Sequence, residues 1–199
     1  GYAVGTQGQV VRKTIMESLV YRDEEGNYLP QLAERWETDP DGLTWRFYLR
    51  KGVKFHDGTD FTAEAVRRSI MRMIDPEKGL PRGADIKFID SVDVVDDHTV
   101  EIKTKQPVGP FLAYVAMDTM SILSPASLDQ WNNDIGWHPV GTGPFKFESY
   151  VPEESITVVR NEDYWGEPAY LDSIIFKTVP EDATRLTMLE AGEADIVNL

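Results

Sequence analysis

The side chains that could do chemistry in this 199-residue sequence are three histidines and several pairs of neighbouring carboxylates. His56, His98 and His138 stand in three separate turn-like contexts. A metal site needs its ligands to converge in space, and these spacings give no sign of convergence. We therefore predict structural or surface roles for the histidines and no metal site.

The carboxylate pairs could serve a hydrolase of the glycosidase type, which holds two acids in one cleft at a defined separation. The pairs are Glu24–Glu25, Asp96–Asp97 and Glu153–Glu154, and all three stand in polar turns, where acidic side chains are readily solvated. We interpret them as surface residues. A carboxylate-based hydrolase remains a remote alternative, and it requires two acids with perturbed pKa values facing one pocket.

The segment Gly141-Thr142-Gly143-Pro144 contains a G-x-G, but no third glycine or helical pattern completes a dinucleotide-binding loop, so we predict a turn before a strand. The usual phosphate-loop, zinc-protease and serine-hydrolase motifs do not occur. The lack of cysteine excludes disulfides, thiolate metal sites and cysteine nucleophiles. The sequence thus predicts no catalytic residues, no cofactor and no enzymatic activity.

Charge and hydropathy narrow the function further. The sequence has 34 acidic and 20 basic residues, for a net charge of -14, which would repel nucleic acid. Hydrophobic residues make up 41%, enough for a folded core. No run of 18 apolar residues predicts a membrane span, and the sequence begins at Gly1 without a signal peptide, in the manner of a trimmed chain.

The elements that must position these residues are mixed. Leu43, Trp45, Phe47 and Leu49 alternate with polar residues and predict a strand with one buried face. Helical spacing of apolar residues predicts a helix over 6–21. A second helix is predicted from Thr62 to about residue 75, because the residue before a proline resists helical geometry.

Later segments continue this mixture of helices and hairpins. A hairpin is predicted over 92–102. Short helices are predicted over 110–117 and 125–131, with a strand over 121–123 between them. Three strands (145–150, 155–160 and 173–179) and a helix over 182–190 follow. The order of elements predicts an α/β class, mixed with antiparallel hairpins.

Several motifs resemble the family 5 extracellular solute-binding proteins, the receptors of ABC importers for peptides, nickel and glutathione. Residues 32–58, LAERWETDPDGLTWRFYLRKGVKFHDG, resemble the family signature, which continues through 61–66. Residues 111–118 and 121–124 look most like the dipeptide-binding branch. The series is completed in the family's order by PVGTGPF at 139–145 and YWG at 164–166.

The resemblance implies one lobe of a two-lobed fold, the type II, cluster C periplasmic-binding-protein fold, which closes on its ligand by hinge motion. Family members are more than twice this length, so residues 1–199 would be most of the N-terminal lobe, with the second lobe absent. A core subdomain would comprise about 1–45 and 140–199, and an additional subdomain about 46–139.

The implied function is extracytoplasmic binding of a di- or oligopeptide and its delivery to the membrane permease subunits of an ABC importer. We expect a periplasmic or extracellular location, a lipoprotein or free form, and a monomer at full length. A nickel chelate, glutathione or an oligosaccharide is the alternative solute. A structural or chaperone-like role for an exposed apolar face is a further alternative.

In similar proteins the ligand cleft is approached by two segments, which carry over to this sequence as Val4, Gly5, Thr6 and Gln7, and as Met117, Asp118, Thr119 and Ser121. The first segment could instead merely cap the helix that begins near it. Nickel-binding members carry an arginine just before the Leu-Ser-Pro equivalent, where this sequence has a serine. That departure favours peptides over metal chelates. The acidic residue that grips a peptide amino group should lie in the missing lobe.

Overall fold

The computed structural model describes residues 6–80 and 82–198. Its largest sheet is antiparallel, with the strand order β3-β4-β6-β5. The strands are β3 (Ala33–Thr38), β4 (Thr44–Leu49), β5 (Ile89–Asp96) and β6 (Thr99–Thr104). The alternation that predicted β4 is confirmed, because Phe47 and Leu49 turn into the core while the residue between them is only partly buried. The predicted hairpin is confirmed as β5 and β6.

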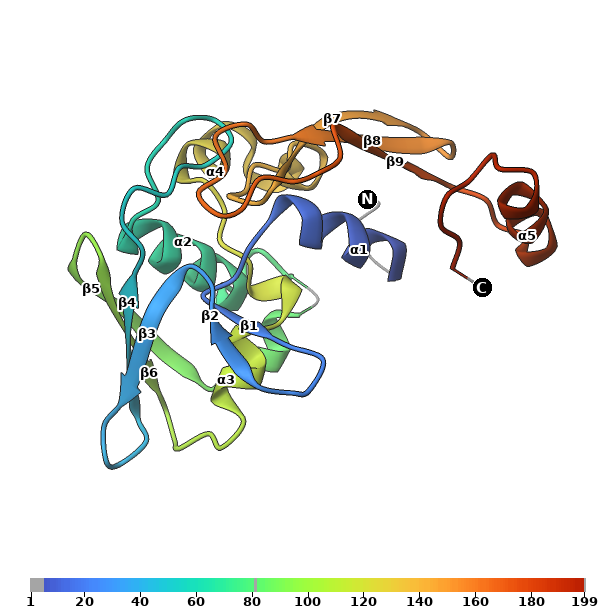
Figure 1. Ribbon diagram of the computed structural model, residues 1–199. Helices are drawn as coiled ribbons and strands as arrows, with labels where there is room; N and C mark the ends of the chain where they lie inside the picture. Colours follow the sequence, from blue (N-terminus) through green and yellow to red (C-terminus); the bar gives the residue numbers. More distant parts are fainter. Residues whose placement is uncertain (1–5, 81, 199) are drawn as a thin grey trace.

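Helix α2 (Ala63–Ile74) packs against this sheet, as Figure 1 shows. It contacts β5 and β6 and buries Val66 and Ile70. It ends where predicted, with Asp75 extended before a proline. Thr62 occupies the N-cap position, but its side chain makes no capping hydrogen bond.

A smaller antiparallel sheet has the order β7-β8-β9, formed by β7 (Phe145–Val151), β8 (Ser155–Arg160) and β9 (Ser173–Lys177). Helix α1 (Thr6–Ile15) packs against β7 (Figure 1). A second hydrophobic cluster joins them, with Val11 and Ile15 from the helix and Phe145, Ile156 and Val158 from the sheet.

The predicted helix over 6–21 is wrong in its second half. The helix ends at Ile15, and β1 (Val20–Arg22) pairs with β2 (Tyr28–Pro30) instead. Leu19 and Val20 are buried, so their apolar character belongs to the core of the larger sheet rather than to one face of a helix. Long-range packing and strand pairing override the local helical spacing.

The predicted strand over 121–123 is also wrong. These residues are extended, but they belong to no sheet. The backbone N–H of Ile122 donates to the carbonyl of Glu17 at 2.9 Å, and that of Leu123 donates to the hydroxyl of Ser69 at 3.0 Å. The hydrogen-bonding needs of this apolar segment are therefore met by neighbouring elements.

Short helices fill the connections. They are η1 (Gly83–Ile86), α3 (Phe111–Val115), η2 (Asp118–Met120), α4 (Pro125–Trp131) and η3 (Asn132–Trp137). The mixture of helices with antiparallel sheets confirms the predicted fold class. Within residues 6–80 and 82–198, no helix combines the length and the apolar character needed to cross a membrane.

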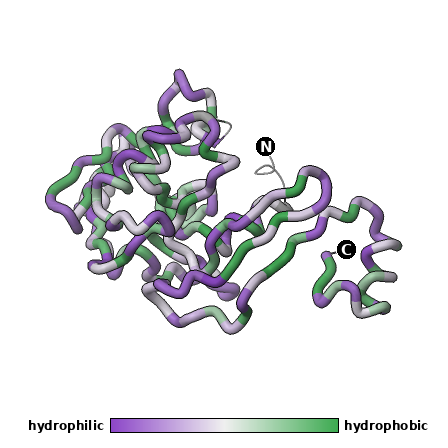
Figure 2. Tube along the Cα trace, turned by 90° about the horizontal axis from the view of Figure 1, so that it is seen from above, coloured by the Kyte–Doolittle hydropathy of each residue, from purple (hydrophilic) through white to green (hydrophobic). Residues whose placement is uncertain are grey.

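The C-terminal helix α5 (Asp182–Glu190) lies apart from the rest of the molecule in both views (Figures 1 and 2), and it has no buried residue. Hydrophobic stretches run along the extended strands that lead to it (Figure 2). Large hydrophobic side chains in this region are exposed: Tyr170, Leu171, Ile175, Leu186, Leu189 and Ile196.

Candidate functional site

Helix α1 and the turn η2 lie together, although more than 100 residues separate them in the sequence. Asp118 accepts hydrogen bonds from the Arg12 guanidinium, at 2.9 Å from Nε and 2.5 Å from Nη2. The Gln9 amide adds a longer bond of 3.4 Å to the same carboxylate. The Arg12 and Asp118 side chains are only 22% and 10% exposed, so this ion pair is better shielded from solvent than a surface pair.

The turn itself is built by short-range bonds. The N–H of Met120 donates to the carbonyl of Met117 at 2.9 Å, and the hydroxyl of Ser121 donates to the carbonyl of Asp118 at 2.7 Å. Met120 is buried and anchors the turn in the core. Thr119 is half-buried, and its hydroxyl makes no hydrogen bond to the part of the chain that is described.

The structure joins the second predicted ligand segment to α1 through Gln9 and Arg12, and it gives the members of that segment different roles. Asp118 and Ser121 are already engaged in holding η2, whereas Thr119 retains hydrogen-bonding capacity. Thr6 and Gln7 form the first turn of α1, and their ligand contacts stay a prediction. Val4 and Gly5 lie outside the described residues.

Sequence reasoning missed a buried carboxylate next to this region. Glu17 is 4% exposed and accepts hydrogen bonds from Thr142 Oγ1 at 2.7 Å, Trp165 Nε1 at 2.8 Å and Tyr164 OH at 2.9 Å. Burial raises the pKa of Glu17, and the hydrogen bonds oppose that rise. The Arg50 guanidinium lies 4.7 Å from the centre of the Trp165 ring.

Two signals could have pointed to this cluster. One is an acidic residue that directly follows the apolar pair Ile15 and Met16 in a segment predicted to be helical, and the other is the YWG motif that the family resemblance singled out. Burial of the phenol raises the pKa of Tyr164 as well, and the nearby Glu17 charge adds to that rise. The cluster ties the segment after α1 to the residues before β7 and to the loop between β8 and β9.

The Gly141-Thr142-Gly143 segment is more than the turn predicted from sequence. The N–H of Gly143 donates to the Ile15 carbonyl at 2.9 Å. A Cβ atom on Gly141 would lie 2.3 Å from that same carbonyl oxygen, and one on Gly143 would lie 2.7 Å from it. Only glycine allows the two backbones to approach this closely.

His56 holds this glycine segment from the other side. Its Nε2 lies 2.9 Å from the Gly143 carbonyl, and its Nδ1 accepts from the Gly141 N–H at 3.4 Å. Burial lowers the pKa of His56 to about 4, so the ring is neutral at pH 7 with its proton on Nε2. The Asn161 amide also donates to the Gly143 carbonyl, at 3.1 Å.

The remaining chemical candidates do not converge. His138 stacks on Trp131 with ring centres 3.5 Å apart, and His98 lies at the β5–β6 turn. The three predicted carboxylate pairs are all exposed. Across residues 6–80 and 82–198, no group of three or more histidine or carboxylate side chains is placed to hold a metal ion.

Comparison with known proteins identifies the family. Residues 27–199 match the model of the bacterial extracellular solute-binding proteins, family 5 Middle. The glutathione-binding protein GsiB of Escherichia coli is 38% identical over 191 residues, which cover 95% of this chain and 37% of GsiB. The GsiB of Salmonella choleraesuis is 39% identical with the same coverage.

Solved structures agree. DppA from Helicobacter pylori, a periplasmic binding protein in complex with the peptide STSA, has a TM-score of 0.86 at 35% identity, over 96% of this chain and 42% of DppA. The chain therefore spans about two fifths of the length of its relatives and folds as one lobe of a type II periplasmic binding protein. Because the match covers most of its residues, the chain belongs to family 5 of the bacterial extracellular solute-binding proteins.

Proposed function

We propose that the chain is one lobe of an extracytoplasmic receptor that binds a di- or oligopeptide and delivers it to the permease of an ABC importer. The observation that carries the proposal is the family match, together with the likeness to DppA, whose structure holds a peptide. The relatives named above are binding proteins, and the three carboxylate pairs considered from the sequence are all exposed. The receptor acts in the periplasm or on the outer face of the membrane, as a monomer.

The surface around α1 and η2 is one wall of the proposed peptide cleft. The ion pair of Arg12 with Asp118 fixes the two segments relative to each other, which supports a pre-formed wall. Thr119 and the main chain of η2 supply hydrogen bonds to the peptide backbone. Asp118 and Ser121 position that turn, and Met117 adds apolar contact.

The other wall is a second lobe, carried by polypeptide outside residues 1–199. The share of GsiB and DppA that the chain leaves uncovered supports this arrangement. So do the exposed hydrophobic side chains of β9 and α5, which a second lobe would cover.

Within the first lobe we propose a core subdomain of about 1–45 and 140–199, and the hydrophobic cluster shared by α1, β7 and β8 supports it. The remaining residues, about 46–139, form the additional subdomain.

The test is a titration of the protein at the length of its relatives, by calorimetry and thermal shift, with dipeptides, tetrapeptides, glutathione and a nickel–histidine chelate. Peptides should raise the melting temperature in a saturable way. Saturable binding of the chelate alone, or of none of these solutes, would overturn the proposal.

Variants locate the binding wall. Asp118→Asn removes the charge that pairs with Arg12, and we expect it to weaken peptide binding about tenfold, or about 1.4 kcal/mol. Asp129→Asn is the matched control, because Asp129 also pairs with an arginine, Arg68, but on the face between α2 and α4. If the two variants weaken peptide binding equally, that result would argue against a peptide wall at η2.

Glutathione is the second candidate solute, since the GsiB proteins are named for it and are 38–39% identical to this chain. Glutathione is itself a tripeptide, so the same wall could receive it. A receptor selective for glutathione should bind it at least tenfold more tightly than an unmodified tripeptide of alanine. Comparable affinities would favour the general peptide receptor.

A further inference from the structure

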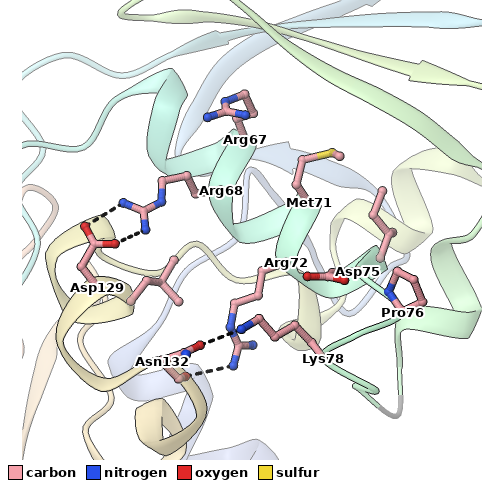
Figure 3. Close-up of a pocket in the computed structure, with 11 residues that line it drawn as sticks. Arg67, Arg68, Met71, Arg72, Asp75, Pro76, Lys78, Asp129 and Asn132 are labelled. Atoms are coloured by element: carbon pink, nitrogen blue, oxygen red, sulfur yellow. Dashed lines mark hydrogen bonds and ion pairs between the residues drawn. The ribbon is translucent and has the colours of Figure 1, made fainter.

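A pocket of about 750 Å³ lies between α2 and α4, and it differs in charge from the rest of the chain. Four of its lining side chains are cationic, Arg67, Arg68, Arg72 and Lys78, whereas only two are acidic. The whole sequence carries a net charge of -14, so a cationic pocket is unusual here. Figure 3 shows Arg68 directed toward Asp129, and Arg72 and Lys78 directed toward Asn132.

Two of the four cations are already neutralised. Arg68 forms a bidentate ion pair with Asp129, in which the hydrogen bond from Nη1 to Oδ2 measures 3.0 Å. Arg67 pairs with Glu64 one turn earlier on α2, at 2.6 Å. These two arginines therefore contribute little net charge to the pocket.

The other two cations converge without a carboxylate partner. Arg72 Nη2 donates to the Asn132 carbonyl at 3.1 Å, and Lys78 Nζ donates to the Asn132 side-chain oxygen at 2.8 Å, as Figure 3 shows. Neither cation forms an ion pair within residues 6–80 and 82–198. Asp75 also lines the pocket, and one of its carboxylate oxygens accepts from the Glu77 N–H.

Two further observations describe Arg72 and the residue that it contacts. The Nε of Arg72 is buried and makes no hydrogen bond, which is costly for a charged donor. Burial also lowers the pKa of Arg72. Asn132, which both cations contact, has φ of 42° and ψ of -102°, a strained backbone for a residue other than glycine.

We propose that this pocket binds a small oxyanion, a phosphate or carboxylate group, between Arg72 and Lys78. A guanidinium presents parallel N–H donors that match two oxygens of such a group, and the lysine ammonium adds a compact charge. None of the predicted peptide-contacting residues lines this pocket, so the proposal does not depend on the solute that the protein carries.

The oxyanion can come from solution or from the headgroup of an anionic phospholipid, and two arms of one experiment separate these sources. The first arm titrates the 199-residue chain with inorganic phosphate by calorimetry, with sodium chloride adjusted to keep the ionic strength constant. The second measures flotation of the chain with phosphatidylglycerol vesicles and with phosphatidylcholine vesicles. Binding in the first arm alone assigns a free oxyanion, and binding of phosphatidylglycerol in the second assigns a headgroup.

Three variants carry the test. The double variant Arg72→Met, Lys78→Met should lose at least tenfold in affinity for the oxyanion, and Lys78→Met alone should lose severalfold. The control Arg67→Met removes a cation that lines the same pocket but already pairs with Glu64, so it should change affinity less than twofold. Circular dichroism confirms that each variant folds; if the double variant does not, Lys78→Met decides. Saturable binding in neither arm, or equal losses in Lys78→Met and Arg67→Met, would overturn the proposal.

Discussion

Replacing Gly143 with alanine tests whether the close contact between α1 and the segment before β7 stabilises the lobe. The added Cβ would lie 2.7 Å from three backbone atoms of Thr14 and Ile15, and backbone cannot give way by a change of rotamer. Overpacking of this kind costs about 1–3 kcal/mol. Pushing the segments apart would also break the 2.9 Å bond from the Gly143 N–H, worth about 0.5–1.5 kcal/mol.

We therefore expect Gly143→Ala to lower the free energy of unfolding by about 2–4 kcal/mol. Urea titration followed by circular dichroism measures this loss directly, and the melting temperature should fall by roughly 4–16 °C. Gly109→Ala is the matched control, because a Cβ there meets nothing within 4 Å and the backbone has no positive φ. A difference between the two variants below about 0.5 kcal/mol would refute the argument.

Two further predictions concern the buried titratable groups. The pKa of His56 is about 4 in the folded protein, so between pH 6.5 and 4 the unfolded chain binds more protons than the folded one. The stability that this residue contributes is therefore lost as the pH falls through that window. The His56 ring signal in an NMR titration should show a midpoint near 4, and a midpoint above 6 would contradict the burial argument. Trp165→Phe removes a donor that favours the charged form of Glu17 and should raise the pKa of Glu17 further. An acid whose pKa is raised in the folded protein lowers the protein's stability as the pH rises. In urea titrations the variant should therefore lose about 1–2 kcal/mol of unfolding free energy at pH 7 and less at pH 5. Equal losses at the two pH values would contradict this reasoning.

The sequence predicted the elements whose patterns are local. The alternation around Phe47 and the helix between Thr62 and a proline both depend on neighbours within a few residues, and both are confirmed. The helix over 6–21 failed in its second half because Val20 pairs with Pro30 and its neighbour Leu19 is buried in the larger core. A single-sequence pattern contains no information about such partners.

The candidate site also divides into residues that the sequence could point to and partners that only the fold brings together. The resemblance pointed to Asp118, and the structure adds its partner Arg12, which no local motif links to it. Glu17 was hidden because an acid inside an apparent helix is usually solvated, and only the fold brings Thr142 and Trp165 around it. The peptide contacts of Thr6 and its neighbours stay a prediction.

The contact of α1 with the glycine segment also constrains the order in which the chain can fold. Glu17 and Thr142 are 125 residues apart, whereas the hairpins of the larger sheet join residues close in sequence. Loop closure over such a span is slow, so the hairpins should form early and the α1 contact late. At typical synthesis rates of about 5–20 residues per second, the ribosome needs roughly 6–25 s to add those 125 residues. During that interval the apolar face of α1 has no partner, and a chaperone that shields it would act at this step.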